Sequence, residues 1–246
     1  MWNELFVYAA KSAFVLTLLY APYTLLLRKE HFFRQNRLTL VGILVLSLIL
    51  PFINLLHGEI GFVAPQPEPV VMNVEAQPVE PISIDISEPT SQTSQPVAVS
   101  QPTRQPIDYA QWLCILYIIG VSVAIGIRLW QFLRMDRLIR TGCLWHDTVD
   151  GITIYCHAGD IAPYSWLRRI VISQHDYDNH RHEILLHERG HVLCHHSWDI
   201  LLLMIVQTVQ WFNPFVYMFG SSLRDVHEYE ADDYVLRQGV SAGQYQ

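Results

Sequence analysis

Three long apolar segments constrain the fold of this chain more than any other feature of its sequence. They cover Phe6–Leu27, Leu38–Leu56 and Tyr109–Trp130, and each has about the 20 residues that an α-helix needs to cross a bilayer. Hydrophobic residues make up 51% of the chain and charged residues only 16%, which is unusual for a soluble protein. The sequence therefore predicts a mostly α membrane protein with three transmembrane helices, the first of them an uncleaved anchor.

Basic residues predict how these helices are oriented. Arginine and lysine gather between the first two segments and again after the third, at Arg28, Lys29, Arg34 and Arg37 and at Arg134, Arg137 and Arg140. Cytoplasmic loops carry such an excess of positive charge. We expect the N-terminus outside the cell and everything after the third helix in the cytosol.

The segment between the second and third helices has a different composition. Residues 57–108 hold nine of the chain's 13 prolines and almost no aromatic residues. Such a segment cannot bury a core. We expect a disordered extracytoplasmic linker, with a sensory role for it as the alternative.

A short motif, HERGH, suggests chemistry on the cytosolic side. His187 and His191 stand four residues apart, so on a helix both imidazoles leave one face and can reach one metal ion. Glu188 lies beside them and fits the acid/base that takes a proton from a metal-bound water and later gives it to the leaving amine. Asp178 or Asn179 can cap this helix. The motif predicts a zinc peptidase, although it also occurs by chance on surface helices.

A catalytic zinc site needs a third protein ligand, and a second predicted helix, Ser221–Gly239, offers one. It carries Glu228 and, one turn later, Asp232 on the same face. We expect Glu228 to complete the zinc shell and Asp232 to orient a ligand histidine from the second shell.

Other residues of this predicted helix receive structural roles. Ser222 and Asp225 fit a capping pair, and Gly239 fits a stop. Glu230 points to the other side and is expected, with Asp233, to be a solvated charge.

The apolar segment between the two motifs, Asp199–Phe219, is long enough to cross the membrane. A simple crossing would leave His187 and Glu228 on opposite sides, too far apart to share an ion. We therefore predict a segment that dips into the membrane and returns, broken at Asn213 and Pro214, with Gln207 and Gln210 facing protein or a wet cavity. A buried helix lying on the bilayer surface is the alternative.

The region before the motif, from Leu138 to His175, is expected to form a small sheet. Gly151–Tyr155 and Arg169–Ser173 are rich in β-branched residues, and Ala162–Ser165 is prone to turns. An edge strand of such a sheet can hold an extended substrate by backbone pairing. A hairpin that only covers the catalytic helix is the alternative.

The remaining polar residues carry weaker signals. His195 and His196 are expected at a helix end or an interface, and His227 or Tyr229 could approach an oxyanion. Reduced buried thiols are expected for Cys114, Cys143, Cys156 and Cys194. Surface positions are expected for His157, His175, His180, His182 and His227. The net charge of −7 and the lack of a basic run argue against direct nucleic-acid binding.

These residues resemble a known family. HERGH followed by EYEAD is similar to the gluzincin pattern of HExxH and then ExxxD, and WFNPFVY resembles the membrane-bound sensor-transducer peptidases of the BlaR/MecR type. The resemblance implies a multi-pass protein of the bacterial inner membrane that cleaves itself or a transcriptional repressor. Family members usually continue into another span and an external sensor. This chain ends at Gln246, so penicillin binding is not implied, and we expect either input from elsewhere or a shortened product or fragment.

Together these inferences predict a hairpin of two spans (1–56), a linker (57–108), a third span (109–130) and a cytosolic α+β zincin-like domain (131–246) with a membrane-dipping segment (199–219). The predicted function is a Zn²⁺-dependent metalloendopeptidase in signal transduction whose partners are a protein substrate and the bilayer, with homo-oligomer formation left open. The alternatives are a general quality-control peptidase of the membrane and a non-catalytic scaffold or sensor fragment.

Overall fold

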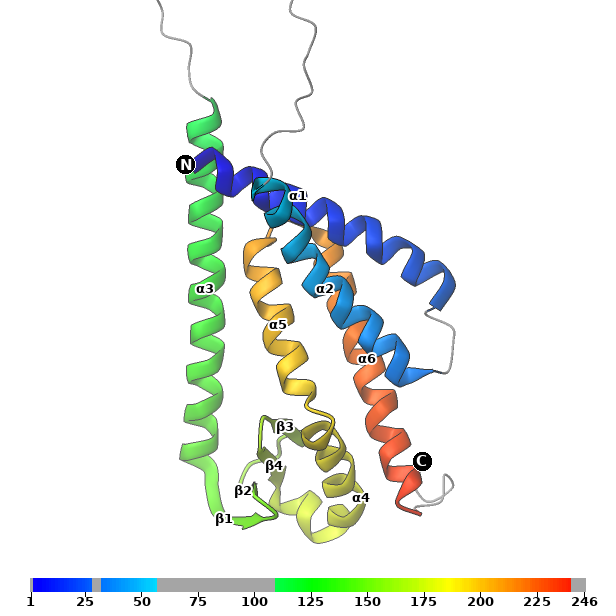
Figure 1. The fold of residues 1–246 in the computed structure, drawn as a ribbon. Coiled ribbons are helices and arrows are strands. Elements are labelled where there is room, and N and C mark those ends of the chain that lie inside the picture. Colours follow the sequence, from blue (N-terminus) through cyan, green and yellow to red (C-terminus); the bar gives the residue numbers. More distant parts are fainter. Residues whose placement is uncertain (1, 28–31, 57–108, 240–246) are drawn as a thin grey trace, which may run out of the picture. The chain divides into compact units, whose positions relative to one another are not determined.

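The computed structural model describes residues 2–27, 32–56 and 109–239 (Figure 1). The predicted linker, residues 57–108, and Arg28 and Lys29 of the first basic cluster lie outside these ranges. The described elements are α1 (Trp2–Pro22), a π-helical turn η1 (Tyr23–Leu27), α2 (Phe33–Leu56), α3 (Tyr109–Gly142), β1 (Cys143–Val149), β2 (Ile152–His157), β3 (Tyr164–Trp166), β4 (Arg169–Ser173), α4 (Gln174–Leu193), α5 (His196–Val209) and α6 (Pro214–Arg237).

Within the described residues, three helical stretches are each long and apolar enough to cross a membrane. They are Glu4–Leu27, Phe33–Ile53 and Gln111–Gly142, close to the three segments predicted. The third differs most, because α3 does not end at Trp130 but continues as helix to Gly142. An ion pair of 2.7 Å between Arg140 and Asp136, one turn apart, supports this extension.

The segment Asp199–Phe219 is not one straight helix. α5 and α6 run in opposite directions, and the chain reverses between them at Gln210–Asn213 (Figure 1). Asn213 caps α6, since its side-chain oxygen accepts a hydrogen bond of 3.0 Å from the amide of Phe215, and Pro214 occupies the first turn. The predicted break at Asn213 and Pro214 is confirmed.

Polar side chains of this hairpin face protein, as predicted. Gln210 is buried and donates to the hydroxyl of Ser12 in α1 at 2.8 Å. Gln207 is also buried and accepts a hydrogen bond of 2.6 Å from Arg128 in α3. Amides between apolar helices need such partners, because an unpaired polar group there is costly.

The predicted cap at Ser222 and Asp225 is wrong. α6 begins at Pro214 and passes straight through both residues, and Ser222 is buried against α1 with its hydroxyl 2.9 Å from that of Tyr20. The predicted stop is confirmed, because Gly239 has a φ of +91° just beyond the last residue of the helix.

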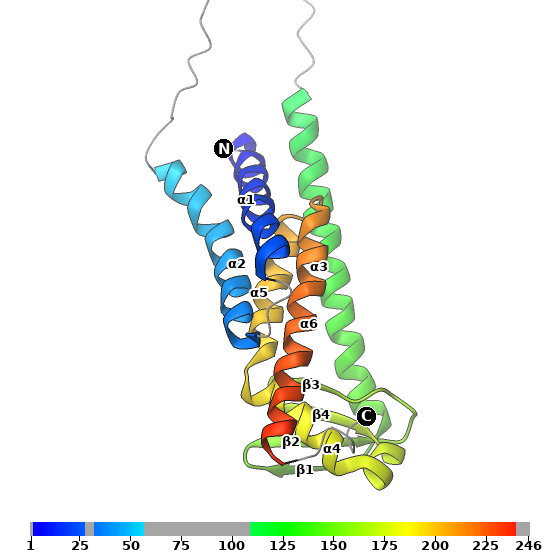
Figure 2. The ribbon, with the colours of Figure 1, turned by 90° about the vertical axis from the view of Figure 1, so that its right-hand side faces the viewer.

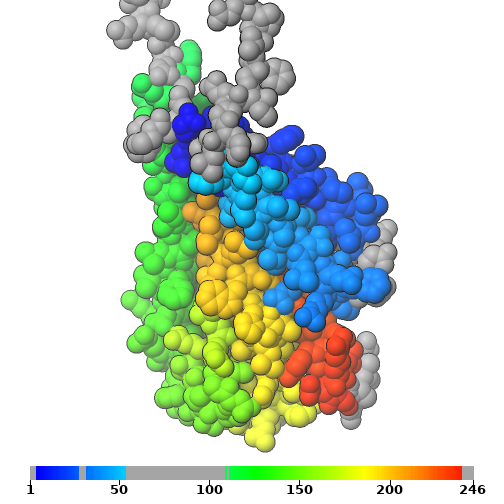
Figure 3. Space-filling view, viewed as in Figure 1, coloured from blue at the N-terminus to red at the C-terminus, as the bar shows by residue number. Residues whose placement is uncertain are grey.

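The apolar core joins α1, α2, α5 and α6. Its fully buried members include Leu16, Leu44, Leu203 and Phe219, one from each of these helices. α3 packs against the turn of the hairpin, where Gly120 leaves room for the ring of Trp211. Figure 2 shows α5 and α6 lying between α2 and α3, and the hairpin contacts each of the three apolar helices. One face of α5 stays uncovered between α2 and α3 (Figure 3), where Trp198 and Ile205 are exposed.

The sheet has four strands in the order β1-β2-β4-β3. β2 and β4 are parallel, while β1 and β3 pair antiparallel at the two edges. The predicted strands at Gly151–Tyr155 and Arg169–Ser173 are confirmed as β2 and β4. Tyr164 and Ser165, predicted in a turn, belong to β3 instead, and the first residues of the region, Leu138–Gly142, are helical.

Candidate metal centre

α4 carries the HERGH motif and follows β4 without a loop. Ser173, the last residue of β4, caps the helix, because its hydroxyl accepts from the amide of Asp176 at 3.1 Å and donates to its carboxylate at 2.8 Å. The predicted caps, Asp178 and Asn179, are wrong, and both lie within the helix just before a kink at His180. After the kink, the helix presents His187 and His191 on one face.

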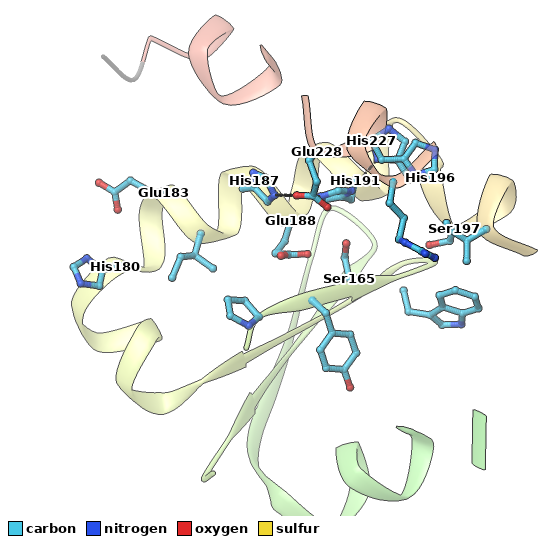
Figure 4. A pocket seen from close by; sticks show the side chains of 16 residues that line it. Ser165, His180, Glu183, His187, Glu188, His191, His196, Ser197, His227 and Glu228 are labelled. Atoms are coloured by element: carbon cyan, nitrogen blue, oxygen red, sulfur yellow. Dashed lines mark hydrogen bonds and ion pairs between the residues drawn. The ribbon is translucent and has the colours of Figure 1, made fainter. Parts of the chain in front are cut away.

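The two histidines and Glu228 of α6 come together as predicted (Figure 4). The Nε2 atoms of His187 and His191 are 3.1 Å apart, and the Oε2 atom of Glu228 lies 3.3 Å and 3.8 Å from them. Ligands on a tetrahedral zinc ion at normal bond lengths are roughly 3.3 Å from each other. The three donors therefore fit a single metal ion of the size of zinc.

Asp232 also lies where the sequence places it. Its carboxylate is 3.1 Å from Nδ1 of His187, the ring nitrogen that faces away from the three donors. A carboxylate in this position holds the proton on Nδ1 and leaves Nε2 free for a metal.

Gly190 allows the two helices to approach closely enough for this arrangement. A Cβ atom added to it would lie 3.3 Å from the Cα atom of Ala231, one residue before Asp232. α4 and α6 can therefore pack with their backbones nearly in contact, which brings short carboxylate side chains within reach of the imidazoles.

Glu188 points into the cavity from the same turn of α4. The residue is only 7% exposed, and its carboxyl faces Ser165 of β3 (Figure 4). Burial raises the pKa of this carboxyl above its ordinary value, because the charged form loses hydration. A carboxyl with a raised pKa is better suited to both accept and donate a proton near neutral pH.

The donor set, which consists of His187, His191 and Glu228, contains a carboxyl whose pKa shifts in the opposite direction to that of Glu188. Hydrogen bonds from His187 and His191 hold the pKa of Glu228 well below its usual range, so this carboxylate is ionised. Burial alone would lower the pKa of His187, but the hydrogen bond to Glu228 and the surrounding carboxylates raise it. A raised pKa favours a proton on the imidazole of His187, and a cation bound to these three side chains would replace this proton.

The donor set lies in a cavity of about 900 Å³, bounded by β3, α4, α5 and α6. All three residues of β3 line it, together with the ligand candidates and Glu188. Because β3 is at the end of the strand order, one side of this strand has no strand partner in the described sheet. An extended peptide can pair with such an edge.

Three sequence predictions about polar residues are wrong. Glu230, expected to be a solvated charge, is paired with Arg37 of α2 at 3.2 Å and with His196 at 3.1 Å, and its side chain is 14% exposed. His227, expected at the surface, is buried with its Nε2 atom 3.0 Å from Asp199. His157 is buried as well. Of the two residues named as able to approach an oxyanion, His227 lines the cavity, whereas Tyr229 stacks on Phe33 and is not among the lining residues.

The remaining histidine predictions agree with the structure. His175, His180 and His182 are exposed. His195 lies at the junction of α4 and α5 with a φ of +63°, and His196 opens α5. The four cysteines are free thiols, but only Cys114 and Cys156 are buried as expected, whereas Cys143 and Cys194 are half-buried.

Sequence reasoning missed the connection of Arg37 and Asp199 to the site. From the sequence alone, Arg37 is interpreted only as part of a basic cluster and Asp199 only as the first residue of an apolar segment. The sequence signal that could have found them is a charged residue at the end of an apolar segment. Such a residue faces the interior of a helix bundle when a residue of opposite charge lies there to pair with it.

Comparison with known families supplies an independent result. The model of the BlaR1 peptidase M56 family matches residues 27–242, which include α2 to α6, the sheet and every residue of the donor set. No curated protein matches the sequence. Because the family model covers most of the chain, this protein belongs to the BlaR1 peptidase M56 family.

Proposed function

We propose that this chain is a membrane-embedded zinc metalloendopeptidase that cleaves itself or a cytosolic regulator, such as a transcriptional repressor, to relay a signal. The observation that carries the proposal is the triangle formed by His187, His191 and Glu228, with the buried carboxyl of Glu188 beside it. Family membership supports the peptidase class.

In this proposal His187, His191 and Glu228 hold Zn²⁺, which polarises the scissile carbonyl and makes a water molecule more acidic. Glu188 accepts a proton from the attacking water and delivers it to the leaving amine. Ser165 orients the carboxyl of Glu188, and Asp232 keeps the proton of His187 on Nδ1.

The substrate backbone would lie along β3. Tyr164, Ser165 and Trp166 line the cavity, and pairing with this edge would place a peptide bond between Glu188 and the donor set.

We also propose that the site faces the cytosol, with the N-terminus outside. The described basic residues of both clusters support this orientation, because Arg37 at the start of α2 contacts the same end of α6 that bears Glu228. Arg134, Arg137 and Arg140 lie near the end of α3 that leads into the sheet.

A substrate trap tests the function. The full chain with Glu188→Gln, kept in its native membrane, should retain bound zinc and hold uncleaved substrate that can be identified after crosslinking. One regulator or the chain itself supports signalling, whereas many unrelated membrane proteins would support general quality control. If wild-type protein binds zinc but cleaves nothing, and the variant captures no more protein than wild type does, the result would favour a non-catalytic scaffold.

A further inference from the structure

A chain of polar side chains extends from His191 through His196, which also lines the cavity, to Glu230 and Arg37, which are not among the lining residues. The Nδ1 atom of His191 is 2.8 Å from Nδ1 of His196, and Nε2 of His196 is 3.1 Å from the Oε2 atom of Glu230. The same carboxylate oxygen lies 3.2 Å from a terminal nitrogen of Arg37. Hydrogen bonds thus join four side chains one after another, from α4 through α5 and α6 to α2.

Proton positions along this chain are coupled. If Nε2 of His191 offers its lone pair to a metal, the proton of the neutral ring is on Nδ1 and is donated to Nδ1 of His196. His196 must then carry its own proton on Nε2, where it donates to Glu230. The hydrogen bonds are all satisfied only in this one arrangement, so Glu230 selects the tautomer of His191 that can bind a metal.

A second branch begins at the same arginine. The Nε atom of Arg37 donates to the Oδ2 atom of Asp199 at 2.6 Å, and this oxygen is 3.0 Å from Nε2 of His227. The ring of His227 stacks on that of His196, with centroids 4.1 Å apart and planes 8° from parallel. Arg37 therefore fixes both the hydrogen-bond partner of His196 and the ring that packs on its face.

The network is enclosed. Side-chain exposure is 17% for Arg37, 11% for Asp199, 14% for Glu230 and 4% for each of His196 and His227. One guanidinium faces two carboxylates, which leaves a net negative charge behind the donor set. Its forked, planar donors suit two carboxylates at once, a geometry that a lysine ammonium does not reproduce.

We propose that Arg37 is a positioning residue of the metal centre, acting through Glu230 and His196 on His191, so that metal affinity depends on the placement of the second apolar helix. This inference rests on the proposed function, because it presumes that His191 binds the metal. On this inference, a movement of α2 against α4 and α6 changes how tightly the site binds its metal ion.

Metal affinity and coordination test it directly. Full-length wild type and the variants Arg37→Ala, Arg37→Lys and Glu230→Gln are placed in lipid nanodiscs, and zinc affinity is measured by competition with a chromogenic chelator. The absorption spectrum of the Co²⁺ form reports the coordination of the ion. Arg34→Ala is the matched control, since Arg34 is exposed on the same turn of α2 and belongs to neither branch.

We expect Arg37→Ala and Glu230→Gln each to weaken zinc binding by about 10-fold to 100-fold and to alter the Co²⁺ spectrum. Arg37→Lys should fall between Arg37→Ala and wild type, and Arg34→Ala should match wild type. Combining Arg37→Ala with Glu230→Gln should cost less than the product of the single effects, because both act through one chain of contacts.

The outcomes separate this inference from the proposed function. Wild type that binds no zinc would overturn the proposed function. Wild type that binds zinc while Arg37→Ala keeps the same affinity and spectrum would overturn only the role of Arg37. Should Arg37→Ala fail to fold, Arg37→Lys and Glu230→Gln decide the question, and an affinity unchanged in both contradicts the inference.

Discussion

Gly190 of α4 lies directly against Ala231 of α6, so closely that a Cβ atom on residue 190 would come within 3.3 Å of the Cα atom of Ala231. In the sequence, His187 and His191 lie on either side of Gly190, and Glu228 lies shortly before Ala231. The separation of the two helices at this point therefore sets how far the carboxylate is from the imidazoles.

Substituting Gly190 should move the helices apart. We expect Gly190→Val to destabilise the fold by about 1–3 kcal/mol, as overpacking of close contacts does, and to weaken zinc binding more than Gly190→Ala. Thermal unfolding and zinc titration measure the two effects. Gly42→Ala in α2, where nothing lies within 4 Å of the added atom, is the control. It should leave zinc binding unchanged and should not lower the unfolding temperature, because alanine favours a helix over glycine. Zinc affinity unaffected by Gly190→Val would mean that this contact does not set the geometry of the site.

Glu188 should be needed for turnover but not for metal binding. We expect Glu188→Gln to lower kcat by about 10²-fold to 10⁴-fold, the range for loss of a general acid/base, with the zinc content unchanged. Peptide cleavage and metal analysis on one preparation test this directly. A variant that loses zinc in parallel with activity would show that Glu188 holds the metal instead.

The raised pKa of Glu188 also predicts a stability effect. Burial disfavours the ionised form in the folded state, so ionisation costs stability once the pH rises above the ordinary glutamate value of about 4.3. In metal-free protein, Glu188→Gln should therefore raise the melting temperature at neutral pH. The difference should shrink as the pH falls below that value, where both states are protonated. A lower melting temperature for the variant at neutral pH would contradict the assignment.

The local chemistry of the site could be read from the sequence, because each motif lies on a single helix. The spacing of His187 and His191, and of Glu228 and Asp232, fixes which side chains share a helical face whatever the tertiary structure. The break at Asn213 followed from requiring the two motifs to meet. Gly239 ended its helix as predicted, since its positive φ is a local property.

The chain of hydrogen bonds from His191 through His196 and Glu230 to Arg37 could not be predicted in the same way. Arg37 and Glu230 are separated by 193 positions, and only the packing of α2 on α6 brings them together. Helical periodicity correctly predicted that Glu230 points away from the cavity. The sequence contains no information on which residues Glu230 meets on the other side of the helix. The start of α6 was misplaced for a related reason, because its apolar first half resembles a membrane span and hides the cap at Asn213.

Glu228 should be distinguishable from its neighbours by metal analysis. We expect Glu228→Ala to reduce zinc binding by more than 100-fold, since it would remove one of the three proposed ligands, whereas loss of a supporting side chain costs about 10-fold to 100-fold. Asp225→Ala, which changes an exposed carboxylate one turn earlier on α6, should leave zinc binding unchanged. Full zinc occupancy in Glu228→Ala would exclude it as a ligand.

The contact between α3 and the hairpin gives a prediction remote from the metal. A Cβ atom on Gly120 would overlap the ring of Trp211, so Gly120→Ala should displace the turn of the hairpin and destabilise the fold by about 1–3 kcal/mol. Gly126→Ala, on the same helix with nothing within 4 Å, is the control. Equal unfolding temperatures for the two variants would show that Trp211 moves aside without cost.

Labelling in intact cells tests the orientation on which the cytosolic assignment depends. A cysteine introduced in the predicted linker by Ser94→Cys should react with a membrane-impermeant maleimide, whereas His175→Cys, at the exposed start of α4, should react only after the membrane is permeabilised. The parent chain with its four cysteines replaced by serine or alanine provides the background. If both positions react from the outside, the site faces the exterior, and a cytosolic repressor could not be its substrate. If both react only after permeabilisation, the linker is not extracytoplasmic and the predicted three crossings are wrong.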